Sequence, residues 1–364
     1  FSHTSHEQAR EVISLIKSIN QELDVHTAIL ADLQGPKIRI GALSKPIKIV
    51  KGEDFFITTS KLSKKGVFVN YKNFAKDVKP KDVVLLDDGK LRLHVVFTDK
   101  KNLVKTKVVF GGILSSNKGV NLPNTRISLP CLTKKDLKDL DFILRENISW
   151  IALSFVREAE DVLKLKRIIK KKNSKIGVVS KIEKPEAIEF IDEIISVSDA
   201  VMVARGDLGV EVPAFRVPAY QKMIVAKAVK KARPVIIATQ MLESMTENAV
   251  ATRAEVNDVA NAVIDGADAV MLSGETSVGR FPLQTVETMR SIIRDIEVSD
   301  YNFQSEFNCP KGGLGDKPRK ISDAICAHAT QLSEQVKAKA IITMTYSGYN
   351  AIKTSSYRPS AFVY

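Results

Sequence analysis

The feature that most constrains the fold is a strand–helix unit that recurs along residues 150–297. Each unit opens with a short apolar run and continues with a stretch of helical spacing. The runs are WIALSF (150–155), KIGVVSKIE (175–183), DAVMVARGD (199–207), PVIIATQ (234–240) and DAVMLSGET (268–276), and a similar run near the start, HTAILADLQG (26–35), follows a helix expected over residues 6–19. They are apolar on both faces, as a parallel strand covered by helices requires. The repeat predicts a parallel α/β core.

Residues 36–129 follow a different pattern, in which apolar and polar residues alternate and Gly, Asn and Lys-Lys turns interrupt the runs. This pattern predicts an antiparallel β domain inserted into the α/β core. A second change of composition falls near residues 300–320, where NCPKGGLGDKPRK is rich in Gly, Pro and charge. We therefore expect three parts: residues 1–35 with 130–300, residues 36–129, and residues 301–364 as the start of a further α/β domain.

The net charge of +13 is concentrated in the inserted segment, because residues 36–129 hold 20 basic and 7 acidic residues while the remainder holds 35 of each. Such a block could attract nucleic acid, an anionic membrane surface or phosphorylated small molecules. It could also be a solvated lysine-rich face. The segment lacks the repeated aromatics and the motifs of common nucleic-acid readers, which disfavours the first of these partners.

The apolar runs and the cysteines bear on the compartment. The longest apolar runs are far shorter than the roughly 20 residues that span a bilayer, so we expect no transmembrane helix. The three cysteines, Cys131, Cys309 and Cys326, are widely spaced and fit neither a disulfide framework nor a zinc site. These features favour a reducing cytoplasm.

Polar residues cluster at the ends of the apolar runs. They are Asp32, Ser154, Lys181, Glu183, Arg205, Asp207, Thr239, Gln240, Ser273 and Glu275. In a parallel barrel all strand C-termini emerge on one face, so these side chains would converge there as an active site. The alternative is that each caps the following helix, which suits Ser154 and Ser273. It suits Lys181 poorly, because a Lys at the buried end of an apolar strand needs a charged partner.

Glu183 points the same way as Lys181 in an extended chain, and Asp207 ends the next strand. Two carboxylates make an all-oxygen site suited to Mg²⁺ or Mn²⁺, which fill their shell with waters and substrate oxygens. A hard divalent ion beside a Lys points to an anionic substrate, either phosphorylated or a carboxylate. The alternative is a buried Lys-Glu-Asp ion network with a structural role.

Residues 176–188, IGVVSKIEKPEAI, closely resemble the active-site signature of pyruvate kinase. The resemblance extends over the whole chain in collinear motifs. These are FSH (1–3), ADLQGPKIR (31–39), LPCLTKKD (129–136), MVARGDLGVE (202–211), IIATQMLESM (236–245), ATRAEVNDVANAV (251–263) and MLSGETSVGRFP (271–282). The resemblance implies a (β/α)8 TIM-type barrel, a β-barrel lid inserted into it and a partial C-terminal regulatory α/β domain. It also implies Mg²⁺-dependent (or Mn²⁺-dependent) phosphoryl transfer from phosphoenolpyruvate to ADP, giving ATP and pyruvate.

The resemblance further implies roles for single residues. Lys181 would lie against the transferred phosphoryl group, Glu183 and Asp207 would hold Mg²⁺, and Thr239 would serve proton delivery. Further substrate or nucleotide contacts would come from Arg39, Lys135, Ser154, the backbone of Ala204, Arg205, Gly206 and Asp207, and Glu275 as an orienting group. By the same resemblance we expect a cytoplasmic homotetramer that binds no nucleic acid and no membrane.

Lys37 stands where many members of the family carry a Glu and need K⁺. Ser2, Asp32 and Leu33 match three positions that hold this ion. A Lys resembles the K⁺-independent subgroup, so we expect activity without K⁺. A loop at Thr345, Ser347, Gly348 and Asn350 resembles the site of a phosphorylated effector. The resemblance also places an Arg-x-Asn motif before Phe1 and further domain residues after Tyr364, so we expect a chain truncated at both ends.

Two other functions remain open from the residues alone. One is a different metal-assisted barrel enzyme that acts on a 2-oxo acid or its enol, such as a lyase or an aldolase. The other is a nucleic-acid-binding module with the barrel as its scaffold.

Overall fold

The computed structural model describes residues 1–2, 4–63, 65–123, 125–299 and 319–364 of the chain. They form two compact units, residues 1–198 with 203–220 and residues 199–202 with 221–364. The domain boundary predicted near residues 300–320 falls largely outside the described residues, as does Cys309.

The first unit is built on three parallel strands whose carboxyl ends carry the candidate site. Strands β1 (Leu30–Asp32), β10 (Trp150–Leu153) and β11 (Gly177–Ile182) are successive parallel neighbours. Seven of the ten residues of β10 and β11 are buried and the other three are half-buried, in agreement with their continuous apolar runs. The helices of this unit outside the inserted β domain are α1 (His6–Glu22), α3 (Lys134–Ile143), α4 (Ala159–Lys171), α5 (Pro185–Glu189), α6 (Ile191–Val197), α7 (Arg205–Glu211) and η1 (Ala214–Arg216).

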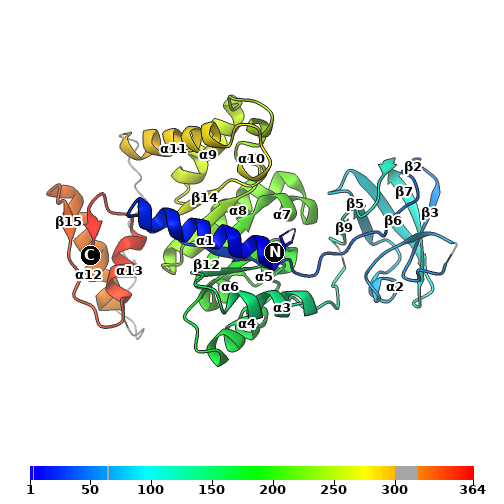
Figure 1. Cartoon of the computed structure of the whole chain (residues 1–364), viewed down its shortest axis with the longest axis horizontal. Helices are drawn as coiled ribbons and strands as arrows, with labels where there is room; N and C mark the ends of the chain where they lie inside the picture. The colour runs from blue at the N-terminus through cyan, green and yellow to red at the C-terminus, as the bar shows by residue number, and fades with distance from the viewer. Residues whose placement is uncertain (3, 64, 124, 300–318) are drawn as a thin grey trace. The chain divides into compact units, whose positions relative to one another are not determined.

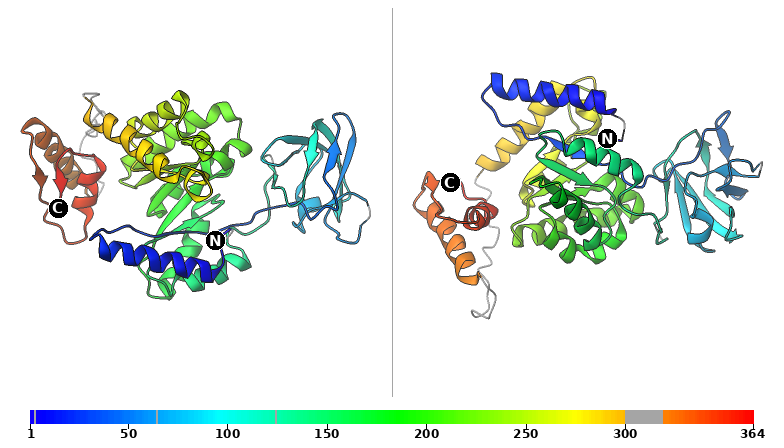
Figure 2. Two further views of the ribbon diagram at one scale, coloured as in Figure 1. Left: turned by 45° about the horizontal axis from the view of Figure 1, so that its top comes forward. Right: turned by 60° about the horizontal axis from the view of Figure 1, so that its bottom comes forward.

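Local sequence explains where several of these helices begin. Ser5 and Gln8 form a capping box at the start of α1, and Thr133 and Asp136 form another at the start of α3. Each box satisfies backbone N–H groups that the first helical turn leaves without partners. The segment after β11 reads as one helix in the sequence, but the structure divides it into α5 and α6 at Phe190. Figure 2 shows α1 in dark blue with its N-terminal end beside the green helices of this unit, where His6 Nε2 meets Asp139 of α3.

The inserted β domain has its own hydrophobic core. Its elements are β2 (Ile47–Ile49), β3 (Asp54–Thr58), β4 (Val67–Phe68), α2 (Phe74–Asp77), β5 (Val83–Leu86), β6 (Leu91–Thr98), β7 (Leu103–Phe110), β8 (Gly112–Leu114) and β9 (Val120–Asn121). One sheet has the order β4-β3-β7-β6-β5-β9, and β2 pairs with β8. Figure 1 shows the strands of this domain in blue and cyan. The pairings are antiparallel as predicted, except that β4 runs parallel to β3. Fully buried side chains such as Phe74, Leu86 and Leu93 fill the core.

The second unit continues the strand–helix alternation. Its elements are β12 (Ala200–Ala204, whose last two residues belong to the first unit), α8 (Val217–Lys230, whose first turn does likewise), β13 (Val235–Ala238), η2 (Glu243–Thr246), α9 (Arg253–Ile264), β14 (Ala269–Met271), α10 (Gly274–Ser277), α11 (Pro282–Val298), α12 (Lys320–Gln335), β15 (Ala340–Ile341), α13 (Tyr349–Ser356) and β16 (Phe362–Val363). Strands β13 and β14 are parallel, and β15 and β16 form a separate parallel pair. In the described residues one sheet has six strands, in the order β1-β10-β11-β12-β13-β14. A complete (β/α)8 barrel has eight.

The compartment features can be compared with the structure in part. No helix in the described ranges is both long enough and apolar enough to cross a bilayer. Cys131 and Cys326 are buried free thiols. Burial raises the pKa of the Cys131 thiol well above its ordinary value, so this sulfur is held as an unreactive thiol.

Candidate active site

Lys181 is the centre of a polar cluster at the carboxyl ends of the three parallel strands. Its Nζ lies 3.1 and 3.2 Å from the two carboxylate oxygens of Asp32, 3.0 Å from Ser154 Oγ and 3.1 Å from Glu183 Oε1. Asp32 ends β1, Ser154 follows β10 and Lys181 belongs to β11. The parallel register therefore brings together Asp32, Ser154 and Lys181, with Glu183 beside them. These are four of the side chains that the sequence analysis placed at strand ends.

The charges of this cluster shift one another's pKa values. Burial disfavours the ammonium form of Lys181, but the carboxylates of Glu183 and Asp32 outweigh burial and hold the pKa of Lys181 above its usual value. Burial raises the pKa of Glu183, the Lys181 ammonium opposes that rise, and the carboxylate of Asp207 adds to it. The site therefore holds a permanent positive charge beside two carboxylates that repel each other.

Glu183 and Asp207 fit the divalent metal that the sequence analysis assigned to them. Glu183 is fully buried, and its Oε1 makes no hydrogen bond to the residues that the structure describes, although Lys181 forms an ion pair with it. Its other oxygen accepts the Phe155 N–H at 2.7 Å. The described part of the chain holds no group of three or more His, Cys, Asp or Glu side chains placed to bind a metal. A pair of carboxylates suits Mg²⁺, which takes its remaining ligands from water and substrate oxygens.

The residues predicted to hold a monovalent cation lie around the same cluster. The Asp32 carboxylate accepts a hydrogen bond from Lys181 Nζ, and the backbone oxygen of Leu33 accepts one from the Ser154 hydroxyl at 2.7 Å. Ser2 follows Phe1, whose backbone nitrogen donates to the backbone oxygen of Asp32 at 2.6 Å. The structure thus brings Asp32 and Leu33 to the Lys181 cluster, while Lys37 lines a pocket with Phe155 and Lys184.

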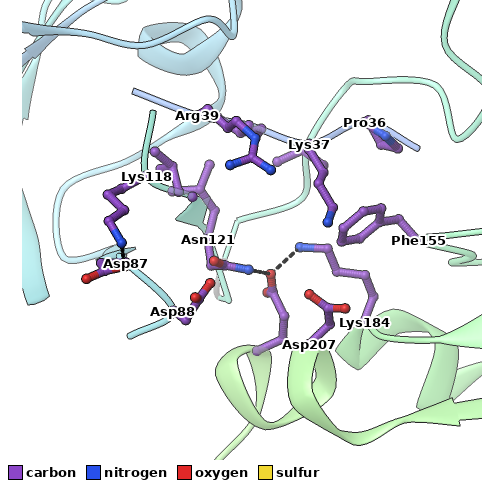
Figure 3. Close-up of a pocket in the computed structure, with 16 residues that line it drawn as sticks. Pro36, Lys37, Arg39, Asp87, Asp88, Lys118, Asn121, Phe155, Lys184 and Asp207 are labelled. Atoms are coloured by element: carbon purple, nitrogen blue, oxygen red, sulfur yellow. Dashed lines mark hydrogen bonds and ion pairs between the residues drawn. The ribbon is translucent and has the colours of Figure 1, made fainter. Parts of the chain in front are cut away.

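That pocket, of about 270 Å³, lies between the inserted β domain and the helices that follow β11 and β12. Lys37, Arg39 and Lys118 line it from the β domain, and Asp207 lines it from α7 (Figure 3). Arg39 is held by its guanidinium, which donates to the backbone oxygen of Asn117 at 2.9 Å. Lys118 pairs with Asp87 at 2.8 Å. The lining thus combines four cations with four carboxylates: Lys37, Arg39, Lys118 and Lys184 with Asp87, Asp88, Asp207 and Glu211.

Sequence reasoning missed Lys118, Asp87 and a buried ion pair in this pocket. The ion pair joins Lys184 to Glu211 at 2.6 Å, and Asn121 donates to the same carboxylate oxygen at 2.8 Å. A charge directly after Glu183 and another at the end of MVARGDLGVE were visible signals. Lys184 and Glu211 lie in different motifs and Asn121 comes from the β domain, so only the folded structure shows that the three side chains are in contact.

Lys135 projects from the first turn of α3. Its Nζ contacts Asp139 at 2.7 Å and the backbone oxygen of Phe1 at 2.6 Å. Asp139 also contacts His6 Nε2, and the His6 ring stacks on Phe142 with ring centroids 4.5 Å apart. The Lys135 ammonium is therefore oriented by its neighbours and is half exposed.

The backbone of residues 204–207 marks the junction of β12 and α7. Ala204 is buried at the end of the strand, and Arg205, Gly206 and Asp207 form the first turn of the helix. Asp207 lines the pocket described above from this turn, so the junction of β12 and α7 borders that pocket.

In the second unit the candidate residues follow β13 and β14. Thr239 and Gln240 have positive φ angles of 71° and 54°, which are strained for side chains other than Gly, and most of all for a β-branched Thr. Glu275 is fully buried and accepts the N–H groups of Ser273 at 2.7 Å and Leu242 at 3.3 Å. Glu275 therefore ties together the loops that follow the two strands.

The predicted effector loop precedes and opens α13. Gly348 caps this helix with φ +76°, a conformation that glycine adopts without strain. Thr345 and Ser347 are exposed, and Asn350 is half-buried in the helix. A role in effector binding stays a prediction.

Comparison with known proteins gives one consistent result. The family model for the pyruvate kinase barrel domain matches residues 1–286, and the model for the pyruvate kinase alpha/beta domain matches residues 323–364. A pyruvate kinase of Corynebacterium glutamicum is 43% identical over 354 residues, which cover 96% of this chain and 72% of that protein. A pyruvate kinase of Clostridium acetobutylicum is 41% identical over 371 residues, with 99% and 76% coverage. The crystal structure of a pyruvate kinase from Cryptosporidium parvum superposes with a TM-score of 0.92 at 36% identity, covering 100% of this chain and 76% of that one.

Proposed function

The chain belongs to the pyruvate kinase family, and on that premise we propose which of its residues carry the reaction. Pyruvate kinase transfers the phosphoryl group of phosphoenolpyruvate to ADP in the last step of glycolysis. The fold is that of the family, an α/β barrel domain with a C-terminal α/β domain. The family generally depends on Mg²⁺.

The observation that carries the proposal is the Lys181 ammonium, held by Asp32, Ser154 and Glu183 in a largely buried position. Phosphoryl transfer needs positive charge against the equatorial oxygens of the transferred group and an in-line arrangement of donor and acceptor. A buried ammonium whose position is fixed by three side chains supplies that charge without rearranging during the reaction. We assign to Lys181 the stabilisation of the transferred phosphoryl group.

We assign to Glu183 and Asp207 the binding of Mg²⁺. When bound there, Mg²⁺ would offset the charge of the substrate carboxylate and of the enolate oxygen. We also assign to backbone N–H groups at residues 204–207 hydrogen bonds donated to the carboxylate of phosphoenolpyruvate, beside these two side chains. The mutual repulsion of Glu183 and Asp207 supports this assignment, because a cation between them would relieve it.

We assign the pocket cations to the phosphates. Arg39 and Lys118 face the cavity from the β domain and are held by neighbouring groups, so they could grip the phosphate chain of ADP at little entropic cost. The half-exposed Lys135 remains a candidate for a further phosphate contact.

We assign to Thr239 the delivery of the proton that converts enolpyruvate into pyruvate, through a water molecule. Its strained backbone supports a functional role, because a β-branched residue with positive φ persists only where the surrounding structure imposes it. Glu275 would keep the loop of Thr239 in place through its hydrogen bond to Leu242.

We further propose that the enzyme is active without K⁺, with the ammonium of Lys37 replacing the ion. The support is the sequence and the position of the residue: Lys37 stands where K⁺-dependent members of the family carry a Glu, and it lines the pocket together with Asp207. Rates should be equal in K⁺-free and K⁺-containing buffer, and Lys37→Glu should create a K⁺ requirement. A many-fold activation of the unmodified chain by K⁺ would contradict this proposal.

The remaining assignments are proposals at the level of organisation. We place the barrel at residues 1–35 and 130–300, the lid at 36–129 and the regulatory domain from 301 onward. We propose a homotetramer in the cytoplasm that answers to a phosphorylated effector at the loop of Ser347 and Gly348. Light scattering of the purified protein, with and without sugar phosphates, would measure the oligomer.

The experiment that tests the proposed function is a coupled assay of ATP and pyruvate formation as Mg²⁺ is titrated. We expect Glu183→Gln to raise the Mg²⁺ concentration needed for half-maximal rate and to lower the maximal rate, because it removes a charged ligand. Glu189→Gln changes an exposed carboxylate on α5 and serves as the control. An unchanged Mg²⁺ dependence of Glu183→Gln would contradict the metal assignment, and a background rate in the unmodified protein would contradict the function.

A further inference from the structure

A buried polar contact joins the inserted β domain to the helix that carries Asp207. Asn121 of β9 donates its side-chain N–H to Glu211 Oε1 at 2.8 Å, and Lys184 Nζ lies 2.6 Å from the same oxygen. Figure 3 shows both contacts as dashed lines below Arg39 and Lys37. The side chains of Lys184 and Glu211 are 7% and 1% exposed. We call these three residues, Asn121, Lys184 and Glu211, the positioning triad.

The carboxylate of Glu211 depends on these two partners. Its Oε2 is buried and has no hydrogen-bond partner among the described residues, so Asn121 and Lys184 both contact the carboxylate through Oε1. A buried charge costs free energy unless it is paired and hydrogen-bonded. Within the folded chain, loss of the Asn121 hydrogen bond would increase this cost, so the arrangement in which Asn121 stays bonded to Glu211 is favoured.

Each member of the triad is a close neighbour in sequence of a residue assigned above. Asn121 lies three residues after Lys118, Lys184 directly follows Glu183, and Glu211 lies one helical turn after Asp207. Residues four apart on a helix share a face, so Glu211 and Asp207 move together. The Asn121–Glu211 bond therefore fixes the separation between the phosphate-binding cations of the β domain and the metal-binding carboxylates.

We propose that the positioning triad seats β9 against α7 and thereby presents the pocket cations to the phosphates of ADP. These are positioning residues, since they act through Lys118, Arg39 and Asp207. The seating follows from the contacts alone, whereas its effect on ADP rests on the proposed function. The two consequences can therefore be measured separately.

The test is Asn121→Ala in two backgrounds of the full chain. In the unmodified background the variant removes a hydrogen bond to a charged group but leaves the Lys184–Glu211 pair intact, so folding should survive. We expect the KM for ADP to rise about tenfold or more with a much smaller change in kcat. The reason is that ADP binding would then have to bring β9 into place against α7. Hydrogen exchange of the peptide 117–123 should become faster, since Val120 N–H bonds to Ile38 of the pocket wall.

The second background is Lys184→Met combined with Glu211→Leu, which replaces the buried pair by apolar side chains and avoids an unpaired charge. Here Asn121 has lost its acceptor, so adding Asn121→Ala should change neither the KM for ADP nor the exchange of peptide 117–123. Such a double-mutant cycle isolates the coupling of Asn121 to the buried pair. Asn102→Ala, at an exposed turn of the same β domain, is the control for amide loss in general.

The outcomes distinguish the inference from the proposed function. Equal effects of Asn121→Ala in both backgrounds, or no effect on exchange in the first, would overturn the positioning triad. If the unmodified chain formed no ATP, the proposed function would fail, and the exchange experiment would still decide whether Asn121 seats β9 on Glu211. Faster exchange with an unchanged KM for ADP would overturn the claim that the triad presents the pocket cations.

Discussion

The contact between Asp32 and Lys181 predicts a stability effect that can be worked out from burial. The side chain of Lys181 is 12% exposed and that of Asp32 is 45% exposed, with carboxylate oxygens 3.1 and 3.2 Å from Nζ. Asp32→Asn keeps the shape and one acceptor oxygen but removes the charge. Breaking a fully buried pair costs about 3–5 kcal/mol and breaking an exposed pair about 0–1 kcal/mol. Because one partner is half exposed and Glu183 remains beside Lys181, we expect a loss of about 1–3 kcal/mol.

The assay is urea unfolding followed by tryptophan fluorescence. Trp150 is the single tryptophan of the chain and belongs to β10, next to β11 in the parallel sheet, so it reports on the first unit. The urea midpoint of Asp32→Asn should fall while the slope of the transition stays constant.

Asp141→Asn is the matched control for this experiment. Asp141 is 43% exposed, close to Asp32, but its partners Lys172 and Arg145 are 56% and 75% exposed. The two variants thus differ mainly in the burial of the cationic partners, and we expect Asp141→Asn to leave the midpoint nearly unchanged. Equal midpoint shifts in the two variants would refute the reasoning that burial of Lys181 makes the contact strong.

Three further changes test other parts of the structure. Glu275→Gln replaces one acceptor oxygen by an NH2 donor, so the N–H group of either Ser273 or Leu242 loses its acceptor. The free energy of unfolding, measured by urea unfolding followed by circular dichroism, should fall by about 1–3 kcal/mol. Gly35→Ala should lower both stability and activity, measured by thermal melting and the coupled assay, because Gly35 has φ +67° and a Cβ would lie 2.8 Å from the Phe155 ring. Burial and the bond to Asp77 raise the pKa of Tyr71 to about 12, above the value of about 10 in an unfolded chain. The stabilisation that comes from this raised pKa is present below pH 10 and is lost between pH 10 and 12. In urea unfolding at rising pH, the free energy of unfolding of Tyr71→Phe should therefore fall by about 1–2 kcal/mol less than that of the unmodified protein over this interval.

Controls and contrary outcomes separate these effects from general damage. Glu287→Gln on the exposed face of α11 should leave stability unchanged, and a loss as large as that of Glu275→Gln would contradict the tethering role. Gly209→Ala places a Cβ at an ordinary 3.6 Å from Val217 within a helix, so it should be tolerated. A tolerated Gly35→Ala would count against the close approach of Phe155. Parallel alkaline profiles of Tyr71→Phe and the unmodified protein would refute the pKa argument.

The strands of the α/β core could be predicted because their signal is local. The apolar runs around β10 and β11 are continuous, and the capping residues Ser5 and Thr133 mark helix starts in the sequence itself. The convergence of Asp32, Ser154 and Lys181 followed from a single geometric rule, that parallel strands end on one face. These parts of the site required no long-range information beyond the fold class.

The parts that sequence reasoning missed depend on contacts between distant segments. Nothing local indicates that β4 pairs in parallel with β3, or that Asn121 reaches Glu211 across 90 positions of the chain. The short strands β8 and β9 give too few residues for periodicity to detect. The break between α5 and α6 at Phe190 is likewise absent from the sequence pattern, since the segment has helical spacing throughout.

The central claim is that the fixed charge of Lys181 stabilises the transferred phosphoryl group, and Lys181→Met tests it most directly. The decisive measurement is the rate of ATP formation from phosphoenolpyruvate and ADP at saturating Mg²⁺, with Lys172→Met as an exposed-lysine control. We predict a loss of about a thousandfold in kcat for Lys181→Met, with near-normal activity for the control and a folded protein by circular dichroism. A folded Lys181→Met enzyme that keeps a tenth or more of the unmodified rate would contradict the account.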